Sequence, residues 1–205
     1  MYITFTYQVL ISCPGDVADK FMPAIKEAVS TINRSLIDNE IIFEGAFGFR
    51  VKTEVLYWRD NGTGEILTGM SGQDVLNEQL VNNADGVIGI FYSKLGTKTD
   101  NYPSGTVEEI EKTLARGKHA AIIPIQDELM PIGLLGDGKE YARLQEYIKT
   151  MQQSHRGLIM CCPPERLNET IKQQMNIILH KSLKQISPDE QKFKTQNLLD
   201  ISKIK

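Results

Sequence analysis

The chain has 205 residues, of which 41% are hydrophobic and 24% charged, and its formal net charge is −3 at pH 7. This length and composition fit one globular domain whose core is large enough to need neither a disulfide nor a metal ion. Lysines and arginines are scattered and no apolar run has the length of a membrane span, so we expect neither a direct nucleic-acid partner nor a membrane partner.

The chain begins with a strand-like apolar run over residues 4–12, which the turn at Cys13-Pro14-Gly15 ends. Asp16 can then cap a helix over residues 17–33, where apolar residues recur at helical spacing. A second strand is predicted over residues 52–58.

The middle of the chain repeats this alternation. Ser71 can cap a helix over residues 73–83, and the continuous apolar run at residues 86–92 is typical of a parallel strand covered on both faces. A turn of small residues then leads to a helix over residues 107–116, which Gly117 ends.

The last segments are a strand over residues 120–126, a helix over 141–153, a short fifth strand over 157–161 and a closing helix over 164–186. We therefore expect one α/β domain over residues 1–186. Residues 187–205 are polar and rich in lysine, which predicts a linker or tail that could lead to another module.

Alternating strands and helices predict a flavodoxin-like, doubly wound, five-stranded parallel sheet in the order 2-1-3-4-5. In such a sheet, ligands bind at the carboxyl ends of the strands where the winding reverses, here between the first and third strands. The loops at residues 12–16 and 93–106 would face each other across this crevice. The segment that starts at Trp58 could cover it as a lid.

Glu109 is the main candidate for chemistry in this crevice, because the helix over residues 107–116 would carry it on the rim. A second interpretation is structural. Thr106 and Glu109 have the spacing of a capping box, in which the threonine hydroxyl and the glutamate carboxylate each accept from the other residue's amide. Local sequence leaves both interpretations open.

Three stretches, taken in order, resemble a bacterial TIR-like family, which is related in fold to Toll/interleukin-1 receptor (TIR) domains and to nucleoside 2-deoxyribosyltransferases. They are the strand end Val9-Leu10-Ile11-Ser12, the segment GMSGQDVLNEQL at residues 69–80, and residues 85–110, which contain DGVIGIF, LGTKT and SGTVEEI. The resemblance extends over roughly residues 7–180, so it is more specific than a single motif.

The resemblance implies which glutamate is catalytic. In deoxyribosyltransferases a Gly-Thr pair precedes the nucleophilic glutamate by a fixed interval, and Gly105-Thr106 stands at that interval before Glu109. TIR enzymes that cleave NAD carry their glutamate on the equivalent helix, so both comparisons select Glu109 over Glu108. Gly105-Thr106 also replaces the Trp-Cys pair of the usual TIR pattern, so TIR substrate contacts are not carried over.

The function implied is that of an NAD+ glycohydrolase, with NAD as the substrate and no cofactor. Breaking the N-glycosidic bond gives the ribose oxocarbenium character, which a carboxylate can stabilise or capture. Nicotinamide leaves as a neutral base, so one glutamate suffices. The resemblance also implies a prokaryotic antiphage immune effector that is activated by self-association, with a sensor module in the same or a partner protein.

Amides and hydroxyls in the two loops can hold ribose or phosphate oxygens, and aromatic rings beside them can stack on a base. For Asp16 a helix cap is the simpler role, and for Tyr92 packing at the strand end is the simpler role. The predicted substrate-binding residues are Ser12, Gly15, Asp16, Trp58, Tyr92, Ser104 and Thr106.

Two other functions remain open. A nucleoside or nucleotide N-glycosidase, or a deoxyribosyltransferase, needs an acid to protonate the departing base, and Glu108 or Asp16 would be the candidates. A non-catalytic adaptor or oligomerisation module would carry its contacts on the helices.

The cysteines and the first residues bear on localisation. Cys13, Cys161 and Cys162 are an odd number and two are adjacent, which favours reduced thiols, and none has the spacing of a zinc site. Residues 1–7 lack the positive charge and cleavage site of a signal peptide. We therefore expect a cytoplasmic protein with no bound metal.

Overall fold

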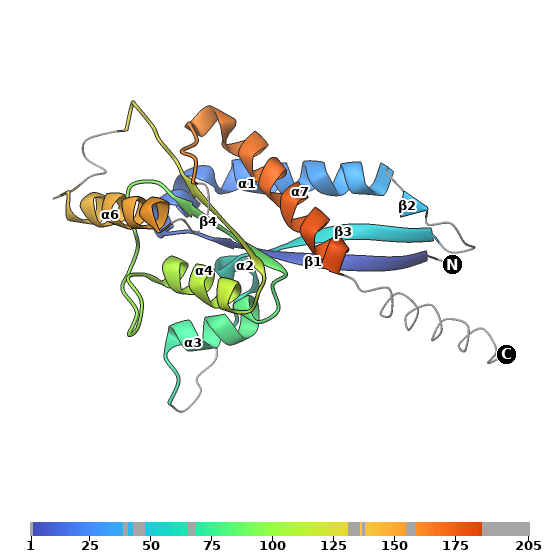
Figure 1. The fold of residues 1–205 in the computed structure, drawn as a ribbon, viewed down its shortest axis with the longest axis horizontal. Helices are drawn as coiled ribbons and strands as arrows, with labels where there is room; N and C mark the ends of the chain where they lie inside the picture. The colour runs from blue at the N-terminus through green and yellow to red at the C-terminus, as the bar shows by residue number, and fades with distance from the viewer. Residues whose placement is uncertain are drawn as a thin grey trace.

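A computed structural model of the chain describes residues 2–38, 41–42, 48–64, 69–130, 136, 138–154 and 159–185. Within these residues, five strands form one sheet in the order β2-β3-β1-β4-β5 (Figure 1). The strands are β1 (Tyr2–Ser12), β2 (Ile41–Ile42), β3 (Gly48–Leu56), β4 (Gly86–Phe91) and β5 (His119–Pro124). All neighbours run parallel except β2, which is antiparallel to β3.

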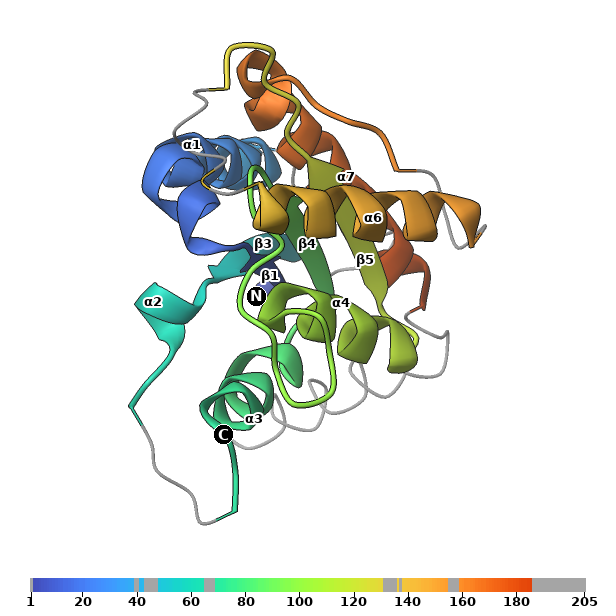
Figure 2. The same cartoon turned by 90° about the vertical axis from the view of Figure 1, so that its left-hand side faces the viewer.

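Helices cover both faces of this sheet (Figures 1 and 2). On one face, α1 (Gly15–Asp38) lies beside α7 (Leu167–Gln185), which the short turn η2 (Pro164–Arg166) precedes. The other face carries α4 (Gly105–Ala115) and α3 (Gly72–Leu76), which continues as the π-helical segment η1 (Asn77–Val81). Helix α6 (Lys139–Gln153) crosses the carboxyl end of the sheet and packs in the same cluster as α4 (Figure 2). A further short helix, α2 (Trp58–Asn61), follows β3.

Successive side chains of a strand point to opposite faces of the sheet, so the core has one layer on each face. Val9 and Ile11 of β1 pack in the cluster with α1 and α7, whereas Leu10 between them packs in the cluster with α4 and α6. In β4, Ile88 and Phe91 belong to opposite clusters in the same way. Burial on both faces explains why these strands read as continuous apolar runs in the sequence.

The predicted order of the first four parallel strands is confirmed, because β3, β1, β4 and β5 correspond to 2-1-3-4. The predicted fifth strand is not found in the described residues. Cys162 forms only an isolated parallel bridge with Ile125, and residues 159–161 are not in a strand. The segment is short and followed by two prolines, Pro163 and Pro164, which cannot donate to a strand ladder.

Several predicted boundaries are moved by tertiary contacts. The first helix is longer than predicted and extends to Asp38, and the second strand ends at Leu56 rather than Trp58, which begins α2. The short strand β2 was not predicted. The predicted tail, residues 187–205, lies outside the described residues. Among the helices described, none is both long and apolar enough to cross a membrane.

Gly89 in β4 lets α4 approach the sheet closely. A β-carbon at this position would lie 2.5 Å from Cδ1 and 3.1 Å from Cγ1 of Ile110, a fully buried residue of α4. Since Ile110 follows Glu109 directly, this close packing of helix on strand also fixes the depth at which Glu109 sits.

We predict that Gly89→Ala lowers the free energy of unfolding by about 1–3 kcal/mol, because the new methyl group must displace Ile110 in a packed core. Urea denaturation measures this loss. The matched control is Gly64→Ala, where no heavy atom lies within 4 Å of the new methyl group. This control should change stability by less than about 0.5 kcal/mol. Equal stability of the two variants would contradict the packing described.

Candidate active site

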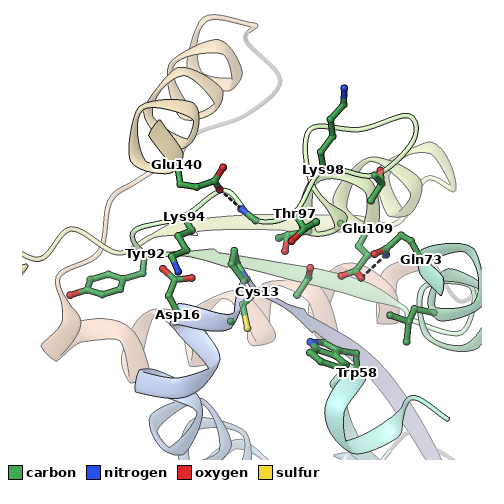
Figure 3. Close-up of a pocket in the computed structure, with 18 of the residues that line it drawn as sticks. Cys13, Asp16, Trp58, Gln73, Tyr92, Lys94, Thr97, Lys98, Glu109 and Glu140 are labelled. Carbon is green, nitrogen blue, oxygen red and sulfur yellow. Dashed lines mark hydrogen bonds between the residues drawn. The ribbon is translucent and has the colours of Figure 1, made fainter. Parts of the chain in front are cut away.

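A cavity of about 1200 Å³ opens at the carboxyl end of the sheet, between the ends of β1 and β4 (Figure 3). One wall is the turn from β1 into α1, and the facing wall is the loop from β4 into α4. Residues of α2, α3 and α6 complete the lining. This is where the winding of the sheet reverses, so the predicted crevice is present at the predicted place.

Glu109 projects into this cavity from the first turns of α4 (Figure 3). The helix is capped by Ser104, whose hydroxyl accepts from the amide of Val107 at 3.2 Å. Thr106 therefore lies inside the helix, and the capping box predicted for Thr106 and Glu109 is wrong. The carboxylate of Glu109 accepts instead from Nε2 of Gln73 at 3.0 Å, which ties it to α3 and not to its own backbone.

The surroundings of Glu109 disfavour its charge. Burial raises the pKa of its carboxyl, and repulsion by Glu108 adds to the rise. Contacts with the Ser12 hydroxyl and the Gln73 amide lower the pKa, but they do not outweigh burial. A poorly solvated carboxylate in a cavity is the arrangement expected of a group that meets a developing positive charge.

Glu108 has a structural role. Its carboxylate accepts from Nδ2 of Asn77 at 2.9 Å and pairs with Nζ of Lys112 at 2.7 Å. The residue is 4% exposed and lies outside the cavity lining. Of the two adjacent glutamates, the structure therefore presents Glu109 to the cavity and uses Glu108 to join α4 to η1.

Asp16 links the two facing loops. Its Oδ2 accepts from both the amide and the hydroxyl of Ser93, each at 2.8 Å. It is not the cap predicted for α1, because the helix begins at Gly15 and Asp16 lies within its first turn. Within the described part of the chain, Asp16 Oδ1 is buried on the cavity wall without a hydrogen-bond partner. A hydrogen bond from a ligand hydroxyl or amide would stabilise a buried acceptor of this kind.

Two of the predicted substrate-binding residues prove to be structural. Ser104 is fully buried, and its hydroxyl caps α4. Tyr92 borders the cavity but is 1% exposed, with its hydroxyl donating to Asp127 at 2.7 Å and accepting from Lys20 at 2.8 Å. Its ring packs edge-on against Phe21. An enclosed ring with its hydroxyl engaged cannot stack on a ligand, so the predictions for Ser104 and Tyr92 are corrected.

Gly15, Trp58 and Thr106 line the cavity as predicted. Trp58 is 43% exposed, and the guanidinium of Arg59 lies 5.2 Å from its ring centre. Arg59 in turn pairs with Asp19 at 3.1 Å, which holds α2 against α1. Residues 65–68 of the predicted lid lie outside the described residues. Trp58 is thus the aromatic surface that this wall offers to a ligand.

Sequence reasoning missed the side chains that brace the cavity. Nothing in the sequence predicts a site role for Gln73, because a neutral glutamine at a helix start carries no charge pattern that would mark it. On α6, Glu140 accepts from the amide of Gly96 at 3.2 Å, and Arg143 donates to the Gly96 and Pro103 carbonyls and pairs with Glu140. These contacts brace the loop from β4 into α4. No local spacing in the sequence indicates a contact between α6 and this loop.

The lining contains basic side chains as well as acidic ones. Lys94 and Lys98, both on the loop after β4, contribute to the cavity wall. Across the residues that the structure describes, no three His, Cys, Asp or Glu side chains gather closely enough to hold a metal ion.

No protein-family model matches the chain, and no curated protein matches it. Two crystal structures of translation elongation factor SelB from Methanococcus maripaludis, in complex with the GTP analogue GPPNHP and in the apo form, align with 88% and 86% of the chain. Their identities are 13% and 11%, their TM-scores 0.40 and 0.43, and the aligned part spans 35% of each.

Oxidised flavodoxin 1 from Bacillus cereus aligns with 86% of this chain and 98% of its own length, at 16% identity and a TM-score of 0.34. Similarities this weak carry no information on function. The chemistry of the cavity therefore rests on its own residues.

The adjacent glutamates of α4 predict opposite changes in stability. The raised pKa of Glu109 means that its favourable contribution is complete below the unfolded pKa and is lost as pH rises through the folded pKa. We expect Glu109→Gln to raise the melting temperature at pH 8 and to have a smaller effect at pH 4. Calorimetry across this pH range measures the difference.

Glu108→Gln is the matched control and should lower the free energy of unfolding by roughly 1–3 kcal/mol, because it breaks the ion pair with Lys112. A destabilising Glu109→Gln at pH 8 would contradict the view that Glu109 is strained by burial.

Proposed function

We propose that this protein hydrolyses NAD+ at the nicotinamide N-glycosidic bond, with Glu109 as the catalytic carboxylate. One observation carries the proposal: a partly buried carboxylate at the switch point of the sheet faces an open cavity and is not used to cap its own helix. The resemblance of the sequence to a bacterial TIR-like family supports the same residue and the same reaction.

The proposed reaction requires one anion close to the sugar. As the bond between C1′ and nicotinamide breaks, positive charge develops on the ribose, and the Glu109 carboxylate stabilises it or captures the sugar. Nicotinamide departs as a neutral base because it starts as a pyridinium cation. The stabilisation is stronger in a partly desolvated cavity than in water, so the burial that raises the pKa of Glu109 also favours the reaction.

Other lining groups fit the rest of a dinucleotide. The unpartnered Asp16 Oδ1 can bind a ribose hydroxyl, Trp58 can stack on a base, and Lys94 can meet a phosphate. The cavity, at about 1200 Å³, exceeds the 300–1000 Å³ typical of sites for drug-sized ligands. This size favours a dinucleotide over a nucleoside.

A second candidate is hydrolysis or transfer at the N-glycosidic bond of a nucleoside or nucleotide. One observation favours it: Asp16 lies on the same cavity with a free carboxylate oxygen, where it could protonate a departing base. Glu108, the other acid considered, is engaged by Lys112 and lies outside the lining.

The proposed physiological role follows the resemblance. A cytoplasmic enzyme that depletes NAD must be silent until it is needed, so we include activation by self-association in the proposal, as in an antiphage immune effector. A non-catalytic adaptor would assemble in the same way but would leave NAD intact.

We expect a concentrated or assembled sample to release nicotinamide from NAD+, and Glu109→Gln to reduce kcat by about 10²-fold or more, as loss of a charge-stabilising group does. Chromatography of the products measures both rates. Glu108→Gln, compared per folded molecule, should retain kcat. Release of free bases from a panel of nucleosides, with NAD+ left intact, would favour the second candidate instead.

The raised pKa of Glu109 predicts the pH dependence of this activity. The reaction needs the ionised carboxylate, so kcat/KM should fall as pH drops through the pKa of Glu109 in the free, folded protein. This acid limb should lie above the ordinary glutamate pKa of about 4.3. A kcat/KM profile from pH 4 to pH 9 tests the prediction, and a profile flat down to pH 4 would contradict it.

A further inference from the structure

We propose that Gln73 is a positioning residue for the reaction: its side-chain amide holds one oxygen of Glu109 and aims the carboxylate into the cavity, and Gly105 provides the space in which Gln73 lies. This inference rests on the proposed function, because it assigns a role within that active site. It goes further in naming two residues, on different helices, that act on the chemistry through Glu109.

The Gln73 amide group is placed by two acceptors at once. Its Nε2 donates to Oε1 of Glu109 at 3.0 Å and lies 3.3 Å from Oδ1 of Asn77 (Figure 3 shows the contact with Glu109). These contacts direct the nitrogen of the amide towards Glu109 and its oxygen towards Gly105. Because the donor engages Oε1, the hydrogen bond leaves Oε2 of Glu109 for the substrate.

The backbone around Gln73 is held equally firmly. Ser71 and Asp74 form a capping box that fixes the start of α3 at Gly72. At the end of α3, Asn77 begins the π-helical segment η1 and also donates to Glu108. π-Helical turns inside helices are frequently found at functional sites. In this segment Asn77 contacts both Gln73 and Glu108 of α4.

Gly105 is required for space and not for backbone conformation. It is not in the left-handed region, so its φ angle alone would permit an alanine. A β-carbon at this position, however, would lie 2.5 Å from Oε1 and 3.2 Å from Cδ of Gln73. Any side chain here would therefore push the end of Gln73 away from Glu109. Gln73 is the flexible partner, so the helix itself would remain.

The consequence for the reaction is an oriented carboxylate. A hydrogen bond to the charged form favours ionisation of Glu109 against the effect of burial. It also removes rotamers in which the carboxylate turns from the sugar. Loss of Gln73 should therefore lower kcat more than it raises KM, because its hydrogen bond acts through the orientation of Glu109.

The test is a double-mutant cycle on the full chain. Gln73→Met keeps the length of the side chain without its donor, and Gly105→Ala displaces the donor without removing it. Each should lower kcat by about 10-fold and move the acid limb of the kcat/KM profile to higher pH. Because both substitutions remove the same hydrogen bond to Glu109, the double variant should be no slower than either single variant.

The matched control is Gly72→Ala, one residue before Gln73. No atom lies near its new methyl group, so this variant should retain kcat.

A second measurement does not depend on turnover. The side-chain carboxyl of Glu109, assigned by comparison with Glu109→Gln, is titrated by ¹³C NMR in the wild type and in both single variants. An upward shift of its pKa in both variants supports the positioning contact, and the absence of a shift overturns it. Additive losses of kcat, or a rise in KM alone, would also overturn it. If the wild type hydrolyses no NAD+, the proposed function fails, and the titration still decides the role of Gln73.

Discussion

A carboxylate that is partly buried and held only by neutral donors is the interaction on which this site depends. Burial makes the charge of Glu109 costly, and the contacts with the Gln73 amide and the Ser12 hydroxyl recover only part of that cost. A cationic partner would stabilise the carboxylate better, but it would also neutralise the charge that the proposed reaction needs. The raised pKa of Glu109 therefore reflects a loss of stability that the proposed reaction would use.

The neighbouring glutamate on the same helix, Glu108, is stabilised by an amide donor and a cation. Glu108 is equally close to the start of α4, yet Asn77 and Lys112 engage it fully. A rotation of about 100° between successive helical residues separates the two environments. One glutamate therefore joins helices, and the other faces the cavity.

The cavity itself is a product of several loops held by hydrogen bonds. Asp16 fastens the turn after β1 to Ser93 after β4, and Arg143 with Glu140 braces the same loop from α6. Ser104 and Tyr92, close to Glu109 in the chain or in the sheet, also have structural roles. The Ser104 hydroxyl caps α4, and the Tyr92 hydroxyl bonds to Asp127 and Lys20. In a packed layer most polar side chains near a site are already engaged by the protein.

The sequence by itself determined the α/β class, the order of four parallel strands and the place of the crevice. Apolar runs indicate buried strands and turns of small residues indicate where strands end, and both signals are local in the sequence. It also singled out Glu109. Only the tertiary structure decided that Ser104, and not Thr106, caps α4, that Cys162 forms an isolated bridge with Ile125, and that Gln73 reaches Glu109. Those outcomes depend on contacts between residues distant in the chain, and side-chain type and spacing do not encode them.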